Sequence, residues 1–116
     1  MSATPISATN AEHYTWGDAC DAWYLVRTPT LNIIEELMPP GTSETPHHHT
    51  QAHQFFYVLA GELTLTVDDE AHTLNPHQGL EILPDQIHQA INRSSAAVRF
   101  LVTSYPPSHN DRIDRS

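Results

Sequence analysis

Short segments of alternating or continuous apolar residues follow one another along the chain from Trp23 onward. Pro, Gly, Asn and Asp separate these segments, and no apolar stripe with the roughly 3.6-residue period of a helix persists. The pattern is typical of β-strands. The predicted strands are Trp23–Arg27, Leu31–Met38, His47–Thr50, Gln54–Ala60, Glu62–Val67, Ala71–Leu74, Leu80–Leu83, His88–Asn92 and Val98–Ser104.

The breaks between these strands contain the turn-forming combinations PPG, DDE, NPHQ, PDQ and NRSS. Many short strands in one chain predict an all-β sandwich, jelly roll or small barrel, because these architectures leave few strand edges exposed. We expect one domain, with an N-terminal arm over residues 1–22, a β-barrel over residues 23–105 and a polar C-terminal tail over residues 106–116. The pattern also allows a short helix around Ala11–Ala22.

The composition excludes several classes of function. The 116-residue chain has five basic residues, all arginine, and fourteen acidic residues, for a formal net charge of −9 at pH 7. This charge repels phosphate backbones and anionic lipid, so we expect neither nucleic acid nor a membrane surface as a partner. Because the chain has no lysine, chemistry through a lysine Schiff base is excluded.

The start of the chain lacks the basic and apolar segments of a secretory signal, and no apolar run approaches the roughly 20 residues of a membrane span. The single cysteine, Cys20, cannot form an intrachain disulfide, and we predict that it is a buried, inert thiol. Both features favour a cytoplasmic protein.

Four of the nine histidines lie within seven positions, between His47 and His53. His47 and His49 are two residues apart, so in a strand they point to the same side and their rings can converge on one ion. His48 then faces the other way. The histidines that we interpret as surface or turn residues are His13, His48, His72, His77 and His109.

Polar residues on later strands extend this cluster. Gln54 begins the apolar strand QFFYVLA, His88 opens another strand, and Asn92 lies four residues beyond on the same face. Imidazole nitrogen is the commonest neutral ligand of transition metals in proteins. Three imidazoles and one amide oxygen would hold a divalent ion and leave positions open for water or substrate. We interpret Asn92 as structural.

The spacing resembles that of the cupin superfamily. The first cupin motif is similar to the pattern Gly41-x5-His47-x-His49-x4-Gln54-x6-Gly61, where x is any residue. The motif has glutamate where this chain has Gln54. The second motif is matched by His88 and Asn92, whereas Leu83, Asp85 and His77 replace its proline and two of its glycines. The flanking segments resemble small bacterial single-domain cupins.

The resemblance implies a small β-barrel of jelly-roll type that binds one divalent metal ion near its open end. Its ligands would be His47, His49, Gln54 and His88, and zinc, nickel, iron and manganese all remain open as the ion. A neutral amide in place of a carboxylate leaves the site at +2 rather than +1, which favours Lewis-acid chemistry. His53 is a rival of its neighbour Gln54, and we favour Gln54 because its spacing to Gly61 matches the motif.

Glu36 is the candidate catalytic residue. In a regular strand it shares a face with Asn32, Ile34 and Met38, whereas Glu35 lies on the opposite face, so one glutamate points into the barrel. A carboxylate beside a metal can act as a general base or orient an imidazole. The alternative is a solvated charge on an edge strand.

The function expected from these features is a metal-dependent cupin enzyme acting on a small molecule that bears a carbonyl, enol or carboxylate group. Isomerisation, cyclisation, lyase and dioxygenase reactions remain open, because a fold does not determine a reaction. The alternatives are a non-catalytic module that binds or senses a small ligand and a storage-like cupin. We expect a homodimer, because Phe55, Tyr57 and Leu59 form an outward apolar stripe on one strand.

Overall fold

The computed structural model describes residues 3–108 and 111–115. These residues form eleven strands and contain no helix, so none of them forms a helix that could cross a membrane. The strands are β1 (Glu12–Trp16), β2 (Cys20–Arg27), β3 (Asn32–Met38), β4 (His47–His49), β5 (His53–Ala60), β6 (Leu63–Val67), β7 (Glu70–Leu74), β8 (Gly79–Ile82), β9 (His88–Ile91), β10 (Val98–Tyr105) and β11 (Arg112–Asp114).

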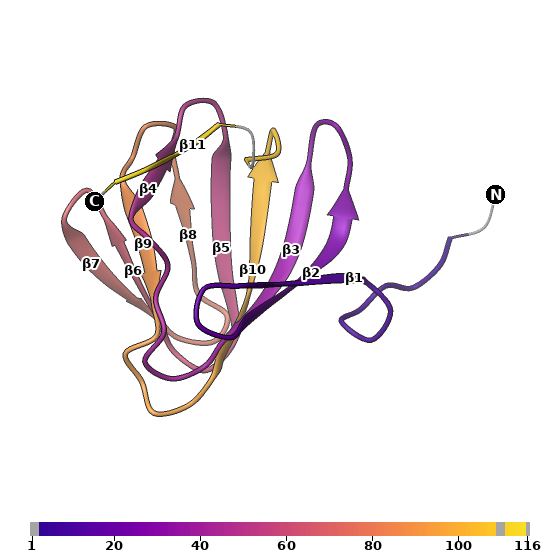
Figure 1. Ribbon diagram of the computed structural model, residues 1–116, viewed down its shortest axis with the longest axis horizontal. Coiled ribbons are helices and arrows are strands. Elements are labelled where there is room, and N and C mark those ends of the chain that lie inside the picture. The colour runs from indigo at the N-terminus through magenta and orange to yellow at the C-terminus, as the bar shows by residue number, and fades with distance from the viewer. Residues whose placement is uncertain (1–2, 109–110, 116) are drawn as a thin grey trace.

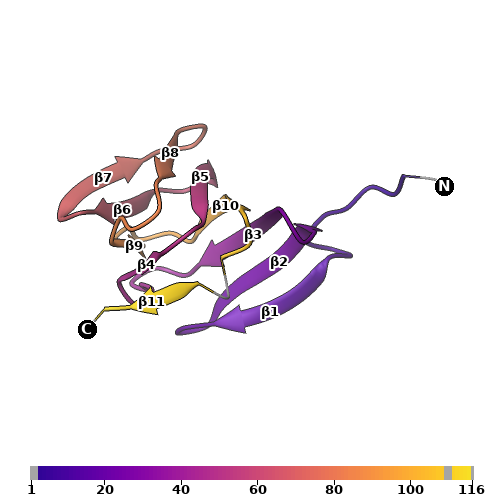
Figure 2. The ribbon, with the colours of Figure 1, turned by 90° about the horizontal axis from the view of Figure 1, so that it is seen from above.

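The strands form two antiparallel sheets, with the order β1-β2-β3-β10-β5-β8 in one and β11-β4-β9-β6-β7 in the other. Figure 1 shows the strands side by side, and Figure 2 shows the two layers from above, with the N-terminal segment leading away from them. The core between the sheets contains Met38, Val58 and Phe100 from the first sheet and Leu63 and Leu65 from the second, all buried. The predicted all-β jelly-roll fold is confirmed.

The register of the first sheet determines which polar side chains reach the interior. Glu36 is paired with Phe100 of β10, which is buried, and Asn32 is paired with Ser104, which in turn pairs with Gln54 of β5. Directly paired residues project from the same face of a sheet. These paired positions therefore bring polar groups from β3, β10 and β5 to the inner face of the first sheet. The second sheet carries the histidines on the face opposite.

The helix allowed around Ala11–Ala22 is wrong. Glu12–Trp16 forms β1 and pairs with β2, with Trp16 opposite Cys20. Gly17 and Ala19 in the connecting turn both have positive φ, which is incompatible with a continuous helix. Residues 12–22 thus belong to the first sheet, and residues 112–114 of the C-terminal segment form a strand of the second sheet.

Two turns have His77 and Asp85 where the second cupin motif has glycine, and both keep the positive φ that glycine adopts easily. His77 and Asp85 have φ values of 68° and 69°, close to the 77° of Gly41. Histidine and aspartate are among the residues that tolerate this left-handed region best. Gly61 has no such substitute, because a Cβ there would lie 2.6 Å from the carbonyl oxygen of Ala97.

Cys20 is fully buried, as predicted, and burial raises the pKa of its thiol. A thiol held protonated in an apolar environment is a poor nucleophile.

Candidate metal centre

Three strands bring the candidate ligands together between the two sheets. His47 and His49 lie on β4, and His88 on the neighbouring β9 is directly paired with His47. Gln54 approaches from β5 of the opposite sheet. All four side chains are buried, with relative exposures between 1% and 6%.

The three imidazoles converge on one point. His47, His49 and His88 each offer one ring nitrogen, and these three atoms lie within 4.8 Å of one another. The ring centroids are 5.0 Å apart for His47 and His49, 4.4 Å for His47 and His88, and 5.6 Å for His49 and His88. Because each ring is buried, its nitrogens need hydrogen-bond partners or a bound ion.

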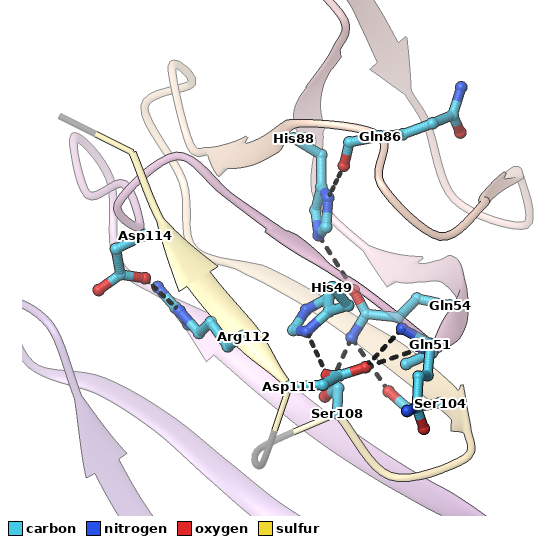
Figure 3. Close-up of polar contacts among 11 residues, drawn as sticks. His49, Gln51, Gln54, Gln86, His88, Ser104, Ser108, Asp111, Arg112 and Asp114 are labelled. Carbon is cyan, nitrogen blue, oxygen red and sulfur yellow. Dashed lines mark hydrogen bonds and ion pairs between the residues drawn. The ribbon is translucent and has the colours of Figure 1, made fainter.

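The outer nitrogen of each ring determines its orientation. Nδ1 of His47 lies 2.8 Å from the carbonyl oxygen of Thr45, and Nδ1 of His88 lies 3.0 Å from that of Gln86. Nδ1 of His49 lies 3.0 Å from Oδ1 of Asp111 (Figure 3). These oxygens only accept, so each Nδ1 donates its proton, and in a neutral ring Nε2 keeps a free lone pair. Such partners are typical of metal-binding histidines.

Within the described part of the chain, the inner nitrogen of His49 has no hydrogen-bond partner, and that of His88 faces an acceptor oxygen. Among the described residues, Nε2 of His49 is buried with no partner. Nε2 of His88 lies 3.0 Å from Oε1 of Gln54, and with Nδ1 protonated both atoms present lone pairs. Two lone pairs that face each other repel, and a cation bound by both atoms would remove that repulsion. The donor set therefore fits a divalent metal ion.

Burial keeps the imidazoles neutral at physiological pH. It lowers the pKa of His47 to about 3 and that of His88 to about 4, with the mutual proximity of the rings adding to the effect. Burial also lowers the pKa of His49, although Asp111 opposes the shift. Neutral rings offer the lone pairs that a metal needs.

Asp111 connects the C-terminal segment to the site. Its Oδ1 accepts from His49, and its Oδ2 accepts the backbone N–H groups of Gln51 and Ala52, both at 2.9 Å (Figure 3). Burial opposes its charge, but these donors together lower the pKa of its carboxyl. Asp111 therefore stays ionised and orients the His49 ring.

Gln54 is held by hydroxyl groups. Its Nε2 donates to Oγ of Ser104 at 3.0 Å and more weakly to Oγ of Ser108 at 3.4 Å (Figure 3). A hydroxyl can donate as well as accept, so the same two serines could satisfy a carboxylate at this position. The surroundings thus tolerate either residue, and the residue type determines the charge of the site.

We expect Gln54→Glu to bind zinc at least about 10-fold more tightly than the wild type, because it adds a negative charge directly beside the cation. Zinc affinity is measured by competition with a chromogenic chelator. Gln78→Glu is the matched control, because it makes the same change of charge on an exposed turn. Equal or weaker zinc binding by Gln54→Glu would show that this side chain does not approach the ion.

A cavity of about 200 Å³ opens beside the imidazoles. His47, His49 and Gln54 line it, and the first sheet contributes Glu36; the strand parity predicted that one of Glu35 and Glu36 points inward, and the structure has Glu36 in that position. Glu35 faces the other side of β3, where it forms an ion pair with Arg99. The remaining polar side chains that line the cavity are Tyr14, Tyr24, Asn32, Glu44, Ser104, Ser108 and Arg112.

The two carboxyls of the cavity are difficult to ionise. Burial raises the pKa of Glu36 to about 8, and the charge of Glu44 raises it further, against the opposing effect of Arg112. Burial also raises the pKa of Glu44 to about 7, although the backbone N–H of Ala90 donates to its Oε1 at 3.0 Å. At neutral pH Glu36 therefore holds a proton beside the candidate metal centre.

The other histidines lie away from the convergent point. His53 stacks on Tyr105 with ring centroids 5.1 Å apart and is not part of the convergent group, which supports the choice of Gln54. His13 pairs with Asp21, and His72 lies 3.5 Å from Glu70. His48 points away from His47 and His49, half-buried, and His77 is exposed on its turn. His109 lies outside the described residues.

Asn92 is structural, as predicted. Its Nδ2 donates to the carbonyl oxygens of Met38 and Ala96, both at 2.9 Å, and its Oδ1 accepts from the backbone and the hydroxyl of Ser94. It joins the end of β3 to the loop after β9 and takes no part in the site.

Three residues near the centre were missed from the sequence: Glu44, Asp111 and Arg112. Glu44 lies in a proline-flanked segment outside any predicted strand, and the other two lie in the segment interpreted as a polar tail. None has a periodic pattern around it that could have indicated an inward position. Pairing of Arg112 with His49 across β11 and β4 is what brings this segment to the site.

Residues 34–104 match the cupin domain family. The chain belongs to this family. Among curated proteins, this cupin is 28% identical to the uncharacterized protein MJ1618 of Methanocaldococcus jannaschii over 69% of the chain and 65% of that protein. It is 34% identical to protein SchB of Streptomyces halstedii over 53% of the chain and 45% of that protein. The alignments therefore span less than two thirds of these relatives.

Solved structures share the fold of this cupin. A sugar phosphate isomerase of the cupin superfamily from Silicibacter pomeroyi superposes with a TM-score of 0.80 at 21% identity, covering 90% of this chain and 76% of that chain. The polyketide cyclase RemF from Streptomyces resistomycificus superposes with a TM-score of 0.83 at 17% identity, covering 99% and 87%. At these identities the similarity concerns the fold alone.

Proposed function

We propose that this cupin is a metal-dependent enzyme that acts on a small molecule bearing a carbonyl, enol or carboxylate group. The observation that carries the proposal is the buried and unpartnered Nε2 of His49, which converges with His47 and His88 at the wall of a cavity. An unsatisfied buried nitrogen is costly, and a metal ion would remove that cost. Gln54 would supply the fourth protein ligand.

A divalent ion held by neutral ligands would act as a Lewis acid on the oxygen of a bound substrate. The protein's own contribution is a proton held on Glu36, which lines the same small cavity. A protonated carboxyl can donate that proton to a substrate oxygen. Glu44 of the same cavity, whose pKa burial raises to about 7, is partly ionised and can accept the carbon-bound proton; exchange with solvent then restores both groups.

Proteins of the same fold are consistent with this range of chemistry. They include the isomerase and the cyclase described above and a predicted oxalate decarboxylase from Thermotoga maritima. Because one fold hosts many reactions, these names support a class of chemistry and not a particular substrate.

Exchange of carbon-bound protons with solvent tests the proposal. Metal-stripped protein is reloaded separately with zinc, nickel, iron(II) or manganese, and 2-oxobutyrate in D₂O is followed by proton NMR. We expect at least one loaded form to accelerate loss of the signal adjacent to the carbonyl by about 100-fold or more over the stripped protein. Iron(II) that instead consumes oxygen with the probe would indicate dioxygenase chemistry.

Two outcomes would contradict the proposal. The first is protein that neither carries a metal after purification nor takes one up at neutral pH, as measured by elemental analysis. The second is protein that holds a metal and binds the probe but never accelerates exchange or oxygen consumption, which would favour the non-catalytic binding module.

We also infer that this cupin forms a homodimer. Its assignment to the small bacterial single-domain cupins and to the cytoplasm stays a prediction. Phe55 on β5 is 40% exposed and stacks on Tyr57 of the same strand, so the predicted apolar stripe lies on the outer face of the first sheet. A monomeric solution mass at micromolar concentration would contradict the dimer.

A further inference from the structure

We propose that Arg112 and Asn32 form a binding site for a carboxylate of the substrate, at the passage between the inner cavity and the protein surface. The inference rests on the proposed function and specifies the class of substrate: an organic acid that places its carbonyl or enol oxygen at the imidazoles and its carboxylate at Arg112.

Two connected spaces lead to the site. The inner cavity of about 200 Å³ holds the candidate ligands, and an outer groove of about 800 Å³ lies beyond it. Asn32 and Arg112 line both spaces, so they stand where one passes into the other. The inner cavity alone is smaller than the roughly 300 Å³ at which ordinary ligand pockets begin, so a bound molecule would extend past these two residues.

Asn32 offers a buried amide without a partner. Its side chain is 2% exposed, and among the described residues its Oδ1 has no hydrogen-bond partner. Only a donor group of a ligand can satisfy this oxygen, whereas an ionised carboxylate would bind to Nδ2 of the same amide. The two N–H groups of the same amide can donate to a carboxylate, and the oxygen can accept from a hydroxyl.

Arg112 supplies the positive charge. It pairs with His49 across β11 and β4, so its side chain projects from the same face as that ligand. Its Nε donates to Oδ1 of Asp114 at 2.7 Å, as Figure 3 shows. The two terminal nitrogens have no hydrogen-bond partner among the described residues, and they form the fork that binds a carboxylate through two parallel bonds.

No second arginine at the site is equally free. Arg27 also lines the outer groove, but both oxygens of Glu12 accept from its Nη1, at 3.1 Å and 3.2 Å, and its guanidinium lies 4.3 Å from the ring centroid of Tyr24. Among the residues that line the inner cavity, Arg112 is the one arginine. A substrate anion would therefore be drawn to Arg112.

The outer groove offers room for the rest of the substrate. Its wall includes Pro29, Pro106, Pro107 and Ile113, and Ile113 is 46% exposed. Polar side chains, among them Thr50, Gln51 and Asp111, share the wall with them, so the groove can accept an apolar ring or chain without selecting for one. The substrate class is thus a carboxylic acid that also carries a metal-binding carbonyl or enol oxygen.

Phenylglyoxylate and its methyl ester test the site, because the ester keeps the ring and the ketone and replaces the charged carboxylate with a neutral group. Binding of each to the full zinc-loaded chain is measured by calorimetry. We expect the wild type to prefer the acid by at least about 10-fold. Arg112→Gln should lose that preference, Arg112→Lys should keep part of it, and Asn32→Ala should weaken binding of the acid by about 3-fold or more. Arg115→Gln is the matched control and should behave as the wild type.

The proposal is overturned if the wild type does not bind the acid, if it binds the ester as tightly, or if Arg112→Gln keeps the full preference. The last result would mean that the carboxylate binds the zinc alone. Zinc content, measured on every variant, separates this test from that of the proposed function: wild-type protein that cannot hold zinc contradicts the enzyme, whereas Arg112→Gln that holds zinc and loses the preference supports the carboxylate site.

Discussion

Replacing His88 with alanine is expected to abolish stoichiometric metal binding. His88 is 1% exposed, its ring is oriented by the carbonyl of Gln86, and its Nε2 faces both the other imidazoles and Oε1 of Gln54. Loss of a group that merely orients a ligand lowers metal affinity by about 10- to 100-fold, so loss of the ligand itself should exceed 100-fold. Elemental analysis after reloading and dialysis measures the bound metal.

His53→Ala is the matched control, because His53 lies in the same histidine-rich segment but stacks on Tyr105 outside the convergent group. It should retain the metal. His88→Gln fills more of the buried volume than alanine and tests whether any loss comes from a collapsed core; circular dichroism confirms that each variant folds. Metal retained by both His88 variants and lost in His53→Ala would reverse the ligand assignment.

Glu36→Gln is expected to slow proton exchange of the probe by about 100-fold or more while the metal stays bound. Glutamine has nearly the same shape but has no proton that it can transfer at neutral pH. Glu35→Gln is the control, because Glu35 lies on the outer face of the same strand and pairs with Arg99. Exchange at the wild-type rate in Glu36→Gln would exclude this residue as the proton donor.

A second measurement on Glu36→Gln needs no substrate. The pKa of Glu36 is raised from 4.5 to about 8 in the folded protein, so between these values the folded state holds a proton that the unfolded state has released. The stability that this group contributes is therefore present below pH 4.5 and is lost as the pH rises toward 8. Relative to the metal-free wild type, the variant should gain free energy of unfolding by at most about 1.4 kcal/mol per pH unit in this window.

Urea unfolding of metal-free protein at pH 5, 6.5 and 8 measures this difference. A constant difference between the variant and the wild type across the three conditions would show that the cavity does not perturb the carboxyl.

Much of the barrel could be predicted because a strand has a period of two. Alternation along residues 47–49 placed His47 and His49 on one face, and the same rule placed Glu36 and Asn32 on one face of β3, without deciding which face is interior. Turn residues located the strand ends to within a few positions. These features are local, so they are present in the sequence before any folding is considered.

The errors and omissions arose where local signals are weak. Residues 11–22 have no clear period, and they became strand because an edge of the first sheet was available for pairing. The three residues of β11 are too short to show alternation, and their pairing with β4 brings Asp111 and Arg112 to the histidines. Glu44 reaches the cavity from a segment without a predicted strand.

By itself, the sequence determined the all-β class, the faces of the individual strands and the residue types that could bind a metal, because these depend on composition and short-range periodicity. Only the tertiary structure decided which strands lie opposite one another. That pairing directs three Nε2 lone pairs to one point, leaves Nε2 of His49 and Oδ1 of Asn32 buried without partners among the described residues, and raises the pKa of Glu36 by burial. Each of these properties depends on contacts between distant segments, and the physical reason is that desolvation and unmet hydrogen bonds exist only once the sheets have packed.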